Sequence, residues 1–131
     1  MKLLPKVIKA GWPIDLVTPV PLSKSHYKER GYNQAALISH PLARALGVRH
    51  ETKALQRIRE TSTQTKLSAE QRFLNVEGAF SGNPAKLNNK TVLLVDDVIT
   101  TGAPMVNCTN ALLTSGASKV YCISVARVFV E

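Results

Sequence analysis

Two adjacent carboxylates, Asp96 and Asp97, stand directly after a short apolar run and before small hydroxyl residues and a glycine. A run this rich in valine and leucine is typical of a strand buried on both faces, so the carboxylates would follow the end of a strand. Thr100, Thr101 and Gly102 then begin a helix, where free N–H groups, two hydroxyls and an absent side chain suit a phosphate monoester. Carboxylates beside such a cradle would bind a different group, such as two ribose hydroxyls or a hydrated Mg²⁺.

The pattern of strand, polar loop and helix predicts where these side chains lie. In an open α/β sheet the loops at the carboxyl ends of the strands form the ligand crevice, so we expect both carboxylates at the mouth of a pocket. A second anion loop is expected directly after the first strand, at Pro21, Leu22, Ser23 and Lys24. A strained or cis peptide would be unsurprising there, although the segment could equally be a plain proline turn.

The first strand is expected over 14–21, and its prolines limit where it can lie. Because proline cannot donate to a sheet ladder, this strand either lies at the edge of the sheet or stops at 18–20. Apolar residues at helical spacing then predict an amphipathic helix over 34–46, closed by Gly47 and kinked or restarted near His40 by Pro41. The next strand is expected over 48–55.

A segment without periodicity follows at about 56–67 and is rich in Arg, Thr, Ser, Gln and Lys. We expect a mobile loop there, either a lid over the site or a solvated connection. Turns are expected at 81–84 and 88–89, ahead of the central strand. After that strand comes a helix that stops at Gly116, with a buried stripe of Met105, Cys108, Leu112 and Leu113. A largely buried strand over 119–126 ends the pattern.

Strands that alternate with helices favour βαβ crossovers and a parallel sheet, so the expected fold class is α/β. At 131 residues, of which 44% are hydrophobic, the chain can bury one core, and we expect a single domain over 1–131. No apolar stretch approaches the roughly 18 residues that cross a bilayer, so we expect a cytoplasmic protein with no membrane partner. The sequence contains neither a dinucleotide-binding glycine fingerprint nor an NTPase P-loop.

The net charge of +8 implies attraction to anions, and nucleic acid, phosphorylated small molecules and acidic partners are all candidates. Cys108 and Cys122 fall inside an expected helix and an expected strand, and we interpret them as small core residues, with no disulfide and no zinc site. The three histidines, His26, His40 and His50, lack the spacing of metal ligands and are expected at the surface or behind ligand-contacting residues.

The stretch Val92–Ala103 is similar to the phosphoribosyl pyrophosphate (PRPP) motif of type I phosphoribosyltransferases, in which apolar residues precede two acids and a Val-x-Thr-Thr-Gly run. Two further stretches narrow the resemblance to the ComF competence-protein family. The first joins Val20-Pro21-Leu22 to Arg30-Gly31-Tyr32-Asn33-Gln34-Ala35. The second joins the spaced residues Arg57, Arg59, Thr61, Gln64 and Leu67 to Arg72, Asn75, Gly78, Ala79 and Phe80. Together these stretches cover most of 15–127.

The resemblance implies a type I phosphoribosyltransferase-like fold, a twisted and mostly parallel sheet flanked by helices, with a PRPP site. Asp96 and Asp97 would take the ribose hydroxyls and support Mg²⁺, largely through water and substrate. The 5′-phosphate would be bound by the residues after them, Val98, Ile99, Thr100, Thr101, Gly102 and Ala103. The pyrophosphate loop would span 21–23, and 57–64 would correspond to the flexible loop that closes over the site.

The activity that this implies is displacement of pyrophosphate from C1 of PRPP by a nitrogen nucleophile, through an oxocarbenium-like transition state. A nucleoside monophosphate is the other ligand expected. Mg²⁺ and loop cations would stabilise the departing pyrophosphate, the cations being Lys24, Arg30, Arg57 and Arg59. The rival hypothesis is a PRPP- or nucleotide-binding domain without transferase activity, which acts in DNA uptake through a partner or single-stranded DNA. A homodimer is a further expectation.

Two departures from the family pattern matter. Pro104 stands where the family usually has Thr or Ser, which removes one hydroxyl and one N–H from the phosphate cradle and should weaken phosphate binding. The cysteine-rich, zinc-binding region that commonly precedes this domain in the family is absent from these 131 residues. The chain is therefore expected to be either a short member of the family or the C-terminal domain of a longer one.

Overall fold

The computed structural model describes residues 11–21, 34–58, 79–99 and 103–127. In chain order they form β1 (Leu16–Pro19), α3 (Gln34–Leu46), β2 (Arg49–His50), β3 (Leu55–Arg57), β4 (Phe80–Gly82), α5 (Pro84–Leu87), β5 (Thr91–Ile99), α6 (Ala103–Thr114) and β6 (Lys119–Arg127). No helix in these ranges is long and apolar enough to span a bilayer.

The main sheet contains four strands in the order β2-β1-β5-β6, and all three pairings are parallel. In the chain, α3 lies between β1 and its neighbour β2, and α6 lies between β5 and its neighbour β6. The chain therefore moves outward in opposite directions from the central pair of β1 and β5, as in a doubly wound α/β sheet. The predicted fold class and the predicted parallel pairing are confirmed for these strands.

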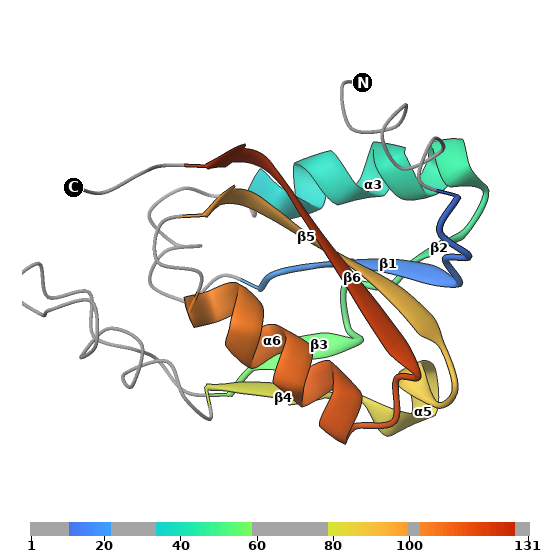
Figure 1. Ribbon diagram of the computed structural model, residues 1–131, viewed down its shortest axis with the longest axis vertical. Coiled ribbons are helices and arrows are strands. Elements are labelled where there is room, and N and C mark those ends of the chain that lie inside the picture. Colours follow the sequence, from blue (N-terminus) through green and yellow to red (C-terminus); the bar gives the residue numbers. More distant parts are fainter. Residues whose placement is uncertain (1–10, 22–33, 59–78, 100–102, 128–131) are drawn as a thin grey trace, which may run out of the picture.

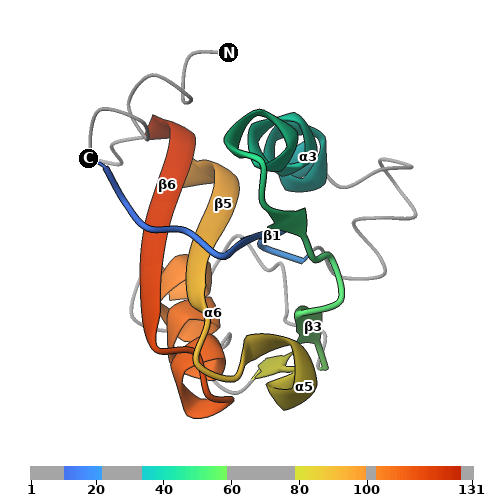
Figure 2. The ribbon, with the colours of Figure 1, turned by 90° about the vertical axis from the view of Figure 1, so that its right-hand side faces the viewer.

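The two long helices cover opposite faces of this sheet (Figure 1 and Figure 2). Successive residues of β5 point to alternate faces, because side chains alternate along a strand. One face packs with α3 in a cluster of Val17, Leu42, Ala43, Leu93 and Val95. The other face packs with α6 and the small β3–β4 sheet, in a cluster that includes Leu55, Leu87, Val92, Leu94, Cys108 and Leu112. The start of β5 is therefore buried on both faces, as its apolar run predicts.

The short strand β1 lies inside the sheet and not at its edge. It pairs with β2 on one side, and with β5 on the other as far as Pro19 opposite Val95. Val17 O accepts a hydrogen bond from Glu51 N–H, just after β2, and Val20 N–H donates to Val95 O of β5. Because successive residues of a strand direct their backbone groups to alternate sides, the position where Pro19 lacks an N–H faces β2. β2 has already ended there, so no hydrogen bond between the two strands is lost. Of the two predicted alternatives, the early stop is therefore the one that the structure shows, and β1 is not an edge strand. Among the described residues no peptide bond is cis.

α3 is one continuous helix although Pro41 lies inside it. A proline at this position removes the hydrogen bond to the carbonyl of Leu37, four residues earlier. Leu37 is 61% exposed and Pro41 is also exposed, so this carbonyl lies on the solvent side of the helix. The predicted bounds of the helix are confirmed, and the predicted restart near His40 is wrong. Gly47 ends the helix with a φ of 72°.

The strand predicted over 48–55 is two short strands in different sheets. β2 ends where Glu51 N–H donates to Val17 O, and after a turn Ala54 N–H donates back to Glu51 O. β3 then pairs antiparallel with β4 in a separate two-stranded sheet. The turn contains no glycine or proline, so the sequence carried no local signal for the break.

The mobile loop predicted at 56–67 begins too early, because its first two residues belong to β3. The antiparallel ladder continues one residue further, where Ile58 N–H donates to Ala79 O at 2.7 Å. The rest of this predicted loop lies outside the described residues. The turn predicted at 81–84 is the end of β4 and the start of α5, whose N-cap is Asn83.

α6 and β6 lie close to their predicted ranges but differ from the prediction in burial. Met105, Cys108 and Leu112 are buried, whereas Leu113 is 46% exposed because it lies about 100° further round the helix than Leu112. β6 is an edge strand of the sheet, and its described side chains are half-buried or exposed, so the prediction of a largely buried strand is wrong. Cys122 is accordingly an exposed free thiol and not a core residue.

Candidate functional site

The carboxyl ends of β1 and β5 meet where the sheet changes its winding direction. β1 precedes α3 on one face, and β5 precedes α6 on the other (Figure 1). A crevice forms at such a point because the chain leaves the two strands toward opposite faces, and ligands of open α/β sheets bind there. We call this place the switch-point site, and it is bordered by Pro21, Asp96 and the start of α6 at Ala103.

Asp96 and Asp97 lie inside β5 and not beyond its end. β5 continues to Ile99 because β6 is long enough to pair with it as far as Ile99 opposite Arg127. Pairing with β1 stops at Val95, so the later residues of β5 have a described strand neighbour on one side only. Both acidic residues therefore lie at the switch point, within a strand that is longer than predicted.

The half-buried side chain of Asp96 lies on the α6 face of the sheet. Strand alternation places it on the same face as Val92 and Leu94, which pack against α6. The electrostatic effect of Asp96 on α6 is consistent with this placement. Burial raises the pKa of the Cys108 thiol on α6, the charge of Asp96 raises it further, and the charge of Arg57 lowers it. The charges of Asp96 and Arg57 thus both act on Cys108, with opposite effects on its pKa.

Arg57 occupies a fixed position in β3 against the ring of Phe80. Its guanidinium carbon lies 5.1 Å from the ring centroid, within the range of a cation–π interaction. The two residues are also directly opposite each other in the β3–β4 ladder. The prediction of Arg57 as a mobile loop cation is therefore wrong about its location. Its positive charge acts from β3 on Cys108 of α6, on which the charge of Asp96 also acts.

Thr18 is a polar residue of this region that sequence reasoning missed. Its side chain is fully buried on β1, and its hydroxyl has no hydrogen-bond partner in the part of the chain that the structure describes. It alternates with Leu16 and Val20, which belong to the α6-side cluster, so it lies on the same face as Asp96. A buried unsatisfied hydroxyl costs about 1–3 kcal/mol. No spacing could reveal it, because threonine is also an ordinary strand former.

Eight predicted site residues lie outside the described residues: Leu22, Ser23, Lys24, Arg30, Arg59, Thr100, Thr101 and Gly102. Val98 and Ile99 are placed through their backbone at the end of β5. Ala103 begins α6, and Pro104 lies in its first turn as predicted. Proline is tolerated there because the first N–H groups of a helix have no partner within it. The structure thus brings Pro21, Asp96 and Ala103 to one edge.

The donors at this edge suit a hard divalent cation. Asp96 supplies carboxylate oxygens, and Asp97 follows it directly in β5. In the described ranges no three His, Cys, Asp or Glu side chains come together, so a bound cation would keep water or ligand oxygens in its shell. Mg²⁺ is bound in this way, through one or two carboxylates plus water and phosphate oxygens. The residues therefore fit Mg²⁺.

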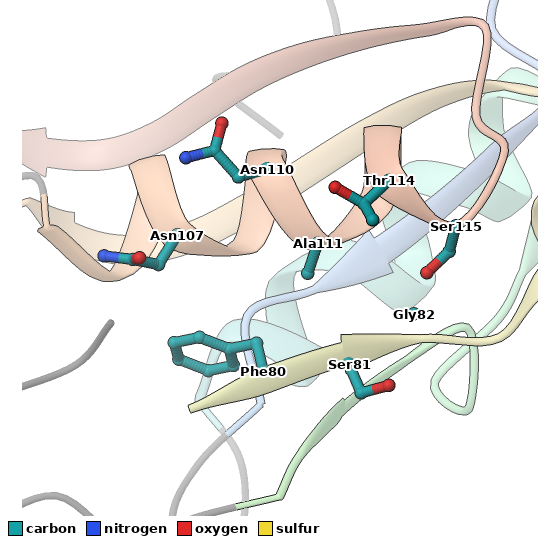
Figure 3. A pocket seen from close by; sticks show the side chains of 8 residues that line it. All are labelled: Phe80, Ser81, Gly82, Asn107, Asn110, Ala111, Thr114 and Ser115. Atoms are coloured by element: carbon teal, nitrogen blue, oxygen red, sulfur yellow. The ribbon is translucent and has the colours of Figure 1, made fainter. Parts of the chain in front are cut away.

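A hollow of about 400 Å³ runs along the seam between β4 and α6 (Figure 3). We call it the β4–α6 groove, and its lining is uncharged: Phe80, Ser81, Gly82, Asn107, Asn110, Ala111, Thr114 and Ser115. Sequence reasoning missed it because its two walls are far apart in the chain. The polar residues of α6 also have the pattern of an ordinary solvent-facing helix surface.

His50 and His40 come together between α3 and β2. Their ring centroids are 5.2 Å apart in an edge-to-face arrangement, and His50 Nε2 lies 2.6 Å from Oγ of the buried Ser39. Burial lowers the pKa of His50, the charge of His40 lowers it further, and Glu51 opposes the shift. These residues are far in sequence from Asp96 and Asp97. The contact between the Ser39 hydroxyl and His50 joins α3 to β2.

The lowered pKa of His50 predicts a loss of stability in mild acid. Because its ordinary pKa is 6.5, the unfolded state binds more protons than the folded state once the pH falls below that value. The contribution of His50 to the free energy of unfolding should therefore be fully present above pH 6.5 and decline as the pH falls below that value. Urea unfolding across this range measures it. The decline should be smaller in His50→Gln, and equal declines in the two proteins would contradict the assignment.

Comparison with known proteins identifies relatives of this chain. The sequence pattern of the phosphoribosyl transferase domain family matches residues 33–128. DNA utilization protein YhgH of Salmonella typhi is 35% identical over 128 residues, which is 92% of this chain and 56% of that protein. Competence protein F of Haemophilus influenzae is 36% identical over 115 residues, 86% of this chain and 50% of that protein. The chain spans about half the length of these curated relatives.

A solved structure with a similar fold is glutamine phosphoribosylpyrophosphate (PRPP) amidotransferase from B. subtilis complexed with ADP and GMP. It superposes with a TM-score of 0.57 at 25% sequence identity, over 94% of this chain and 25% of the larger protein. The allosteric regulatory enzyme of purine biosynthesis gives a TM-score of 0.54 at the same identity. The switch-point architecture described above is thus shared with proteins of the phosphoribosyltransferase fold.

Proposed function

Because the chain belongs to the phosphoribosyl transferase domain family, we propose that the switch-point site binds PRPP, or a nucleoside monophosphate, together with Mg²⁺. The observation that carries this proposal is the position of Asp96, half-buried beyond the end of β1 and on the face covered by α6. The hydroxyls of a ribose donate to a carboxylate, while the N–H groups at a helix start attract a phosphate. A phosphorylated ribose satisfies both groups at once.

The phosphate would lie at the N-terminus of α6. Pro104 contributes no N–H, but Ala103, Met105 and Val106 keep theirs, and the first four N–H groups of a helix have no partner within it. The segment 100–102 would supply the remaining contacts. The result is a phosphate cradle with one donor fewer than usual, so we expect binding in the micromolar range and not tighter.

In the transfer reaction, pyrophosphate would leave C1 of PRPP with the electron pair of the C1–O bond. A nitrogen nucleophile would form the new C1–N bond and release a proton to solvent or to pyrophosphate. Asp96 and Asp97 would hold the ribose, and Arg57 would add positive charge from β3, with Arg59 as a second candidate. Bound Mg²⁺ supplies positive charge that stabilises the oxygens of the departing pyrophosphate.

A second candidate function is a PRPP- or nucleotide-binding domain without transferase activity, which acts through single-stranded DNA or a DNA-uptake partner. The names of two relatives, DNA utilization protein and competence protein, favour it. The net charge of +8 favours it as well, because a basic surface attracts nucleic acid. This alternative shares the same site and differs in the step after ligand binding, which would be an interaction with DNA or a partner and not a transfer reaction.

Calorimetry of the intact chain with PRPP in the presence and absence of Mg²⁺ tests the site. We expect micromolar binding that requires Mg²⁺, and no heat of binding would contradict the proposal. The two functions separate in a parallel titration with oligo(dT) at several salt concentrations. A steep loss of affinity with salt would favour the DNA-linked function, because phosphate contacts release counterions, whereas pyrophosphate release with an added nitrogen acceptor would favour the transferase.

A further inference from the structure

The β4–α6 groove is bordered on one side by a strand edge that has no described partner. Of the two edges of β4, one pairs with β3, and no residue of β3 lines the groove. The three residues of β4 line it in sequence order, Phe80, Ser81 and Gly82. In Figure 3 β4 lies along one side of the hollow and α6 along the other. The edge of β4 that faces the hollow is therefore the one that β3 leaves open.

The register of the β3–β4 ladder shows which backbone groups this open edge presents. Ile58 N–H donates to Ala79 O, and Asn83 N–H donates to Ala54 O. Hydrogen-bonded and non-hydrogen-bonded pairs alternate in an antiparallel ladder, so Gln56 pairs with Ser81 through backbone hydrogen bonds. The N–H and C=O groups of the residues on either side of Ser81 must then point away from β3. Those residues are Phe80 and Gly82.

The opposite wall offers neutral donors and acceptors from α6. Asn110 carries a carboxamide and Thr114 a hydroxyl one turn later, and both side chains are exposed. Each of these groups can donate and accept at the same time. At one end the groove is closed, because a Cβ added to Gly82 would lie 2.6 Å from Ser115 Oγ. The open length from that point to Asn107 is about 12 Å, at 1.5 Å per helical residue.

We propose that the β4–α6 groove binds an extended peptide segment of a partner protein, which adds a third strand along the open edge of β4. One edge of such a segment would pair with Phe80 and Gly82, and its other edge would meet Asn110 and Thr114. A length of about 12 Å holds three to four extended residues at about 3.3 Å each. This mode of recognition relies on main-chain hydrogen bonds and so accepts many side chains.

The lack of charge in the lining favours a peptide over a nucleic acid as the occupant of the groove. The chain carries a net charge of +8, yet no residue of the groove is charged. A nucleic acid strand would place phosphates against a lining that contains no cation, since the guanidinium of Arg57 contacts Phe80 without itself lining the groove. A peptide backbone, by contrast, is neutral and carries alternating donors and acceptors. None of the groove's lining residues is among the predicted residues of the PRPP site, so the inference does not depend on PRPP binding.

Amide hydrogen exchange of the ¹⁵N-labelled full chain tests the proposal, with the blocked peptide acetyl-Thr-Val-Thr-Val-Thr-amide as the probe. At saturating peptide the exchange of the Phe80 and Gly82 amides should slow at least tenfold. The amide of Ser81 should not change, because it already bonds to β3. This alternation is specific to strand addition, and equal slowing of all three amides, or none, would overturn the proposal.

Two variants of α6 provide the matched comparison. Asn110→Leu combined with Thr114→Val keeps the shape of the wall but removes its polar groups, and should weaken peptide binding at least tenfold. Leu113→Ala changes an exposed residue of the same helix outside the groove and should leave binding unchanged. Protection of the same amides by oligo(dT) instead of the peptide would overturn the proposal. So would concentration-dependent protection without any peptide, which would assign the groove to a second copy of the chain.

Discussion

Replacing Asp96 by Asn should weaken the binding of Mg²⁺–PRPP by about 10- to 150-fold. A hydrogen bond to a charged group contributes about 1.5–3 kcal/mol, and about 1.4 kcal/mol corresponds to a tenfold change in affinity. The side chain is half-buried at the switch point, where solvent screens its charge less than at the surface. Calorimetry with Mg²⁺ and PRPP on both proteins measures the difference directly.

Asp15→Asn is the control for this experiment, because it makes the same chemical change at the opposite end of β1. Asp15 Oδ2 accepts a hydrogen bond from Thr91 N–H at 2.8 Å, and the amide oxygen of asparagine can keep that bond. PRPP affinity should therefore be unchanged in this variant. If Asp96→Asn binds as tightly as the wild type, the switch-point site is not the PRPP site. If both variants lose binding equally, the effect of Asp96 is not local.

Replacing Leu112 by Ala should destabilise the protein by about 2–5 kcal/mol, a large share of the stability of a domain this size. Leu112 is fully buried in the cluster that joins α6 to β5 and to the β3–β4 sheet. The smaller side chain loses apolar burial and leaves a cavity, because a packed interior relaxes only partly. Urea unfolding monitored by circular dichroism gives the difference in the free energy of unfolding.

Leu113→Ala is the matched variant, one residue further along the same helix. Its side chain is 46% exposed, so the same truncation should cost less than about 1 kcal/mol. The pair tests the orientation of α6 directly, since the sequence predicts both leucines in one buried stripe. Equal losses of stability in the two variants would contradict the orientation of α6 in the structure.

The bounds of several elements could be predicted from the sequence because their signals are local. The helix over 34–46 follows from apolar spacing and a closing glycine, and the buried start of β5 follows from an unbroken apolar run. The acidic pair and the Thr-Thr-Gly run after it predict the chemistry of the switch-point site from residue types alone. The residues that indicate each of these features lie within about a dozen consecutive positions.

Tertiary structure decided the features that depend on which strands become neighbours. The described side chains of β6 are half-buried or exposed although its composition resembles a core strand, because no described strand lies beyond it in the sheet. β5 runs past Asp96 because β6 offers a partner there, and the segment predicted over 48–55 divides between two sheets. The strand propensity of a residue reflects how well its side chain fits a pleated surface. It does not indicate whether the strand lies at the edge or in the centre of a sheet.

Tertiary structure also determined the position of Arg57 and the existence of the β4–α6 groove. Arg57 lies over Phe80 only because β3 and β4 pair across a long stretch of intervening sequence. The groove exists only where α6 passes the open edge of β4. The sequence by itself thus predicted which groups could bind a phosphorylated ribose and where the two long helices lie. Long-range pairing determined where those groups lie, because contacts between distant segments leave no periodic trace in either one.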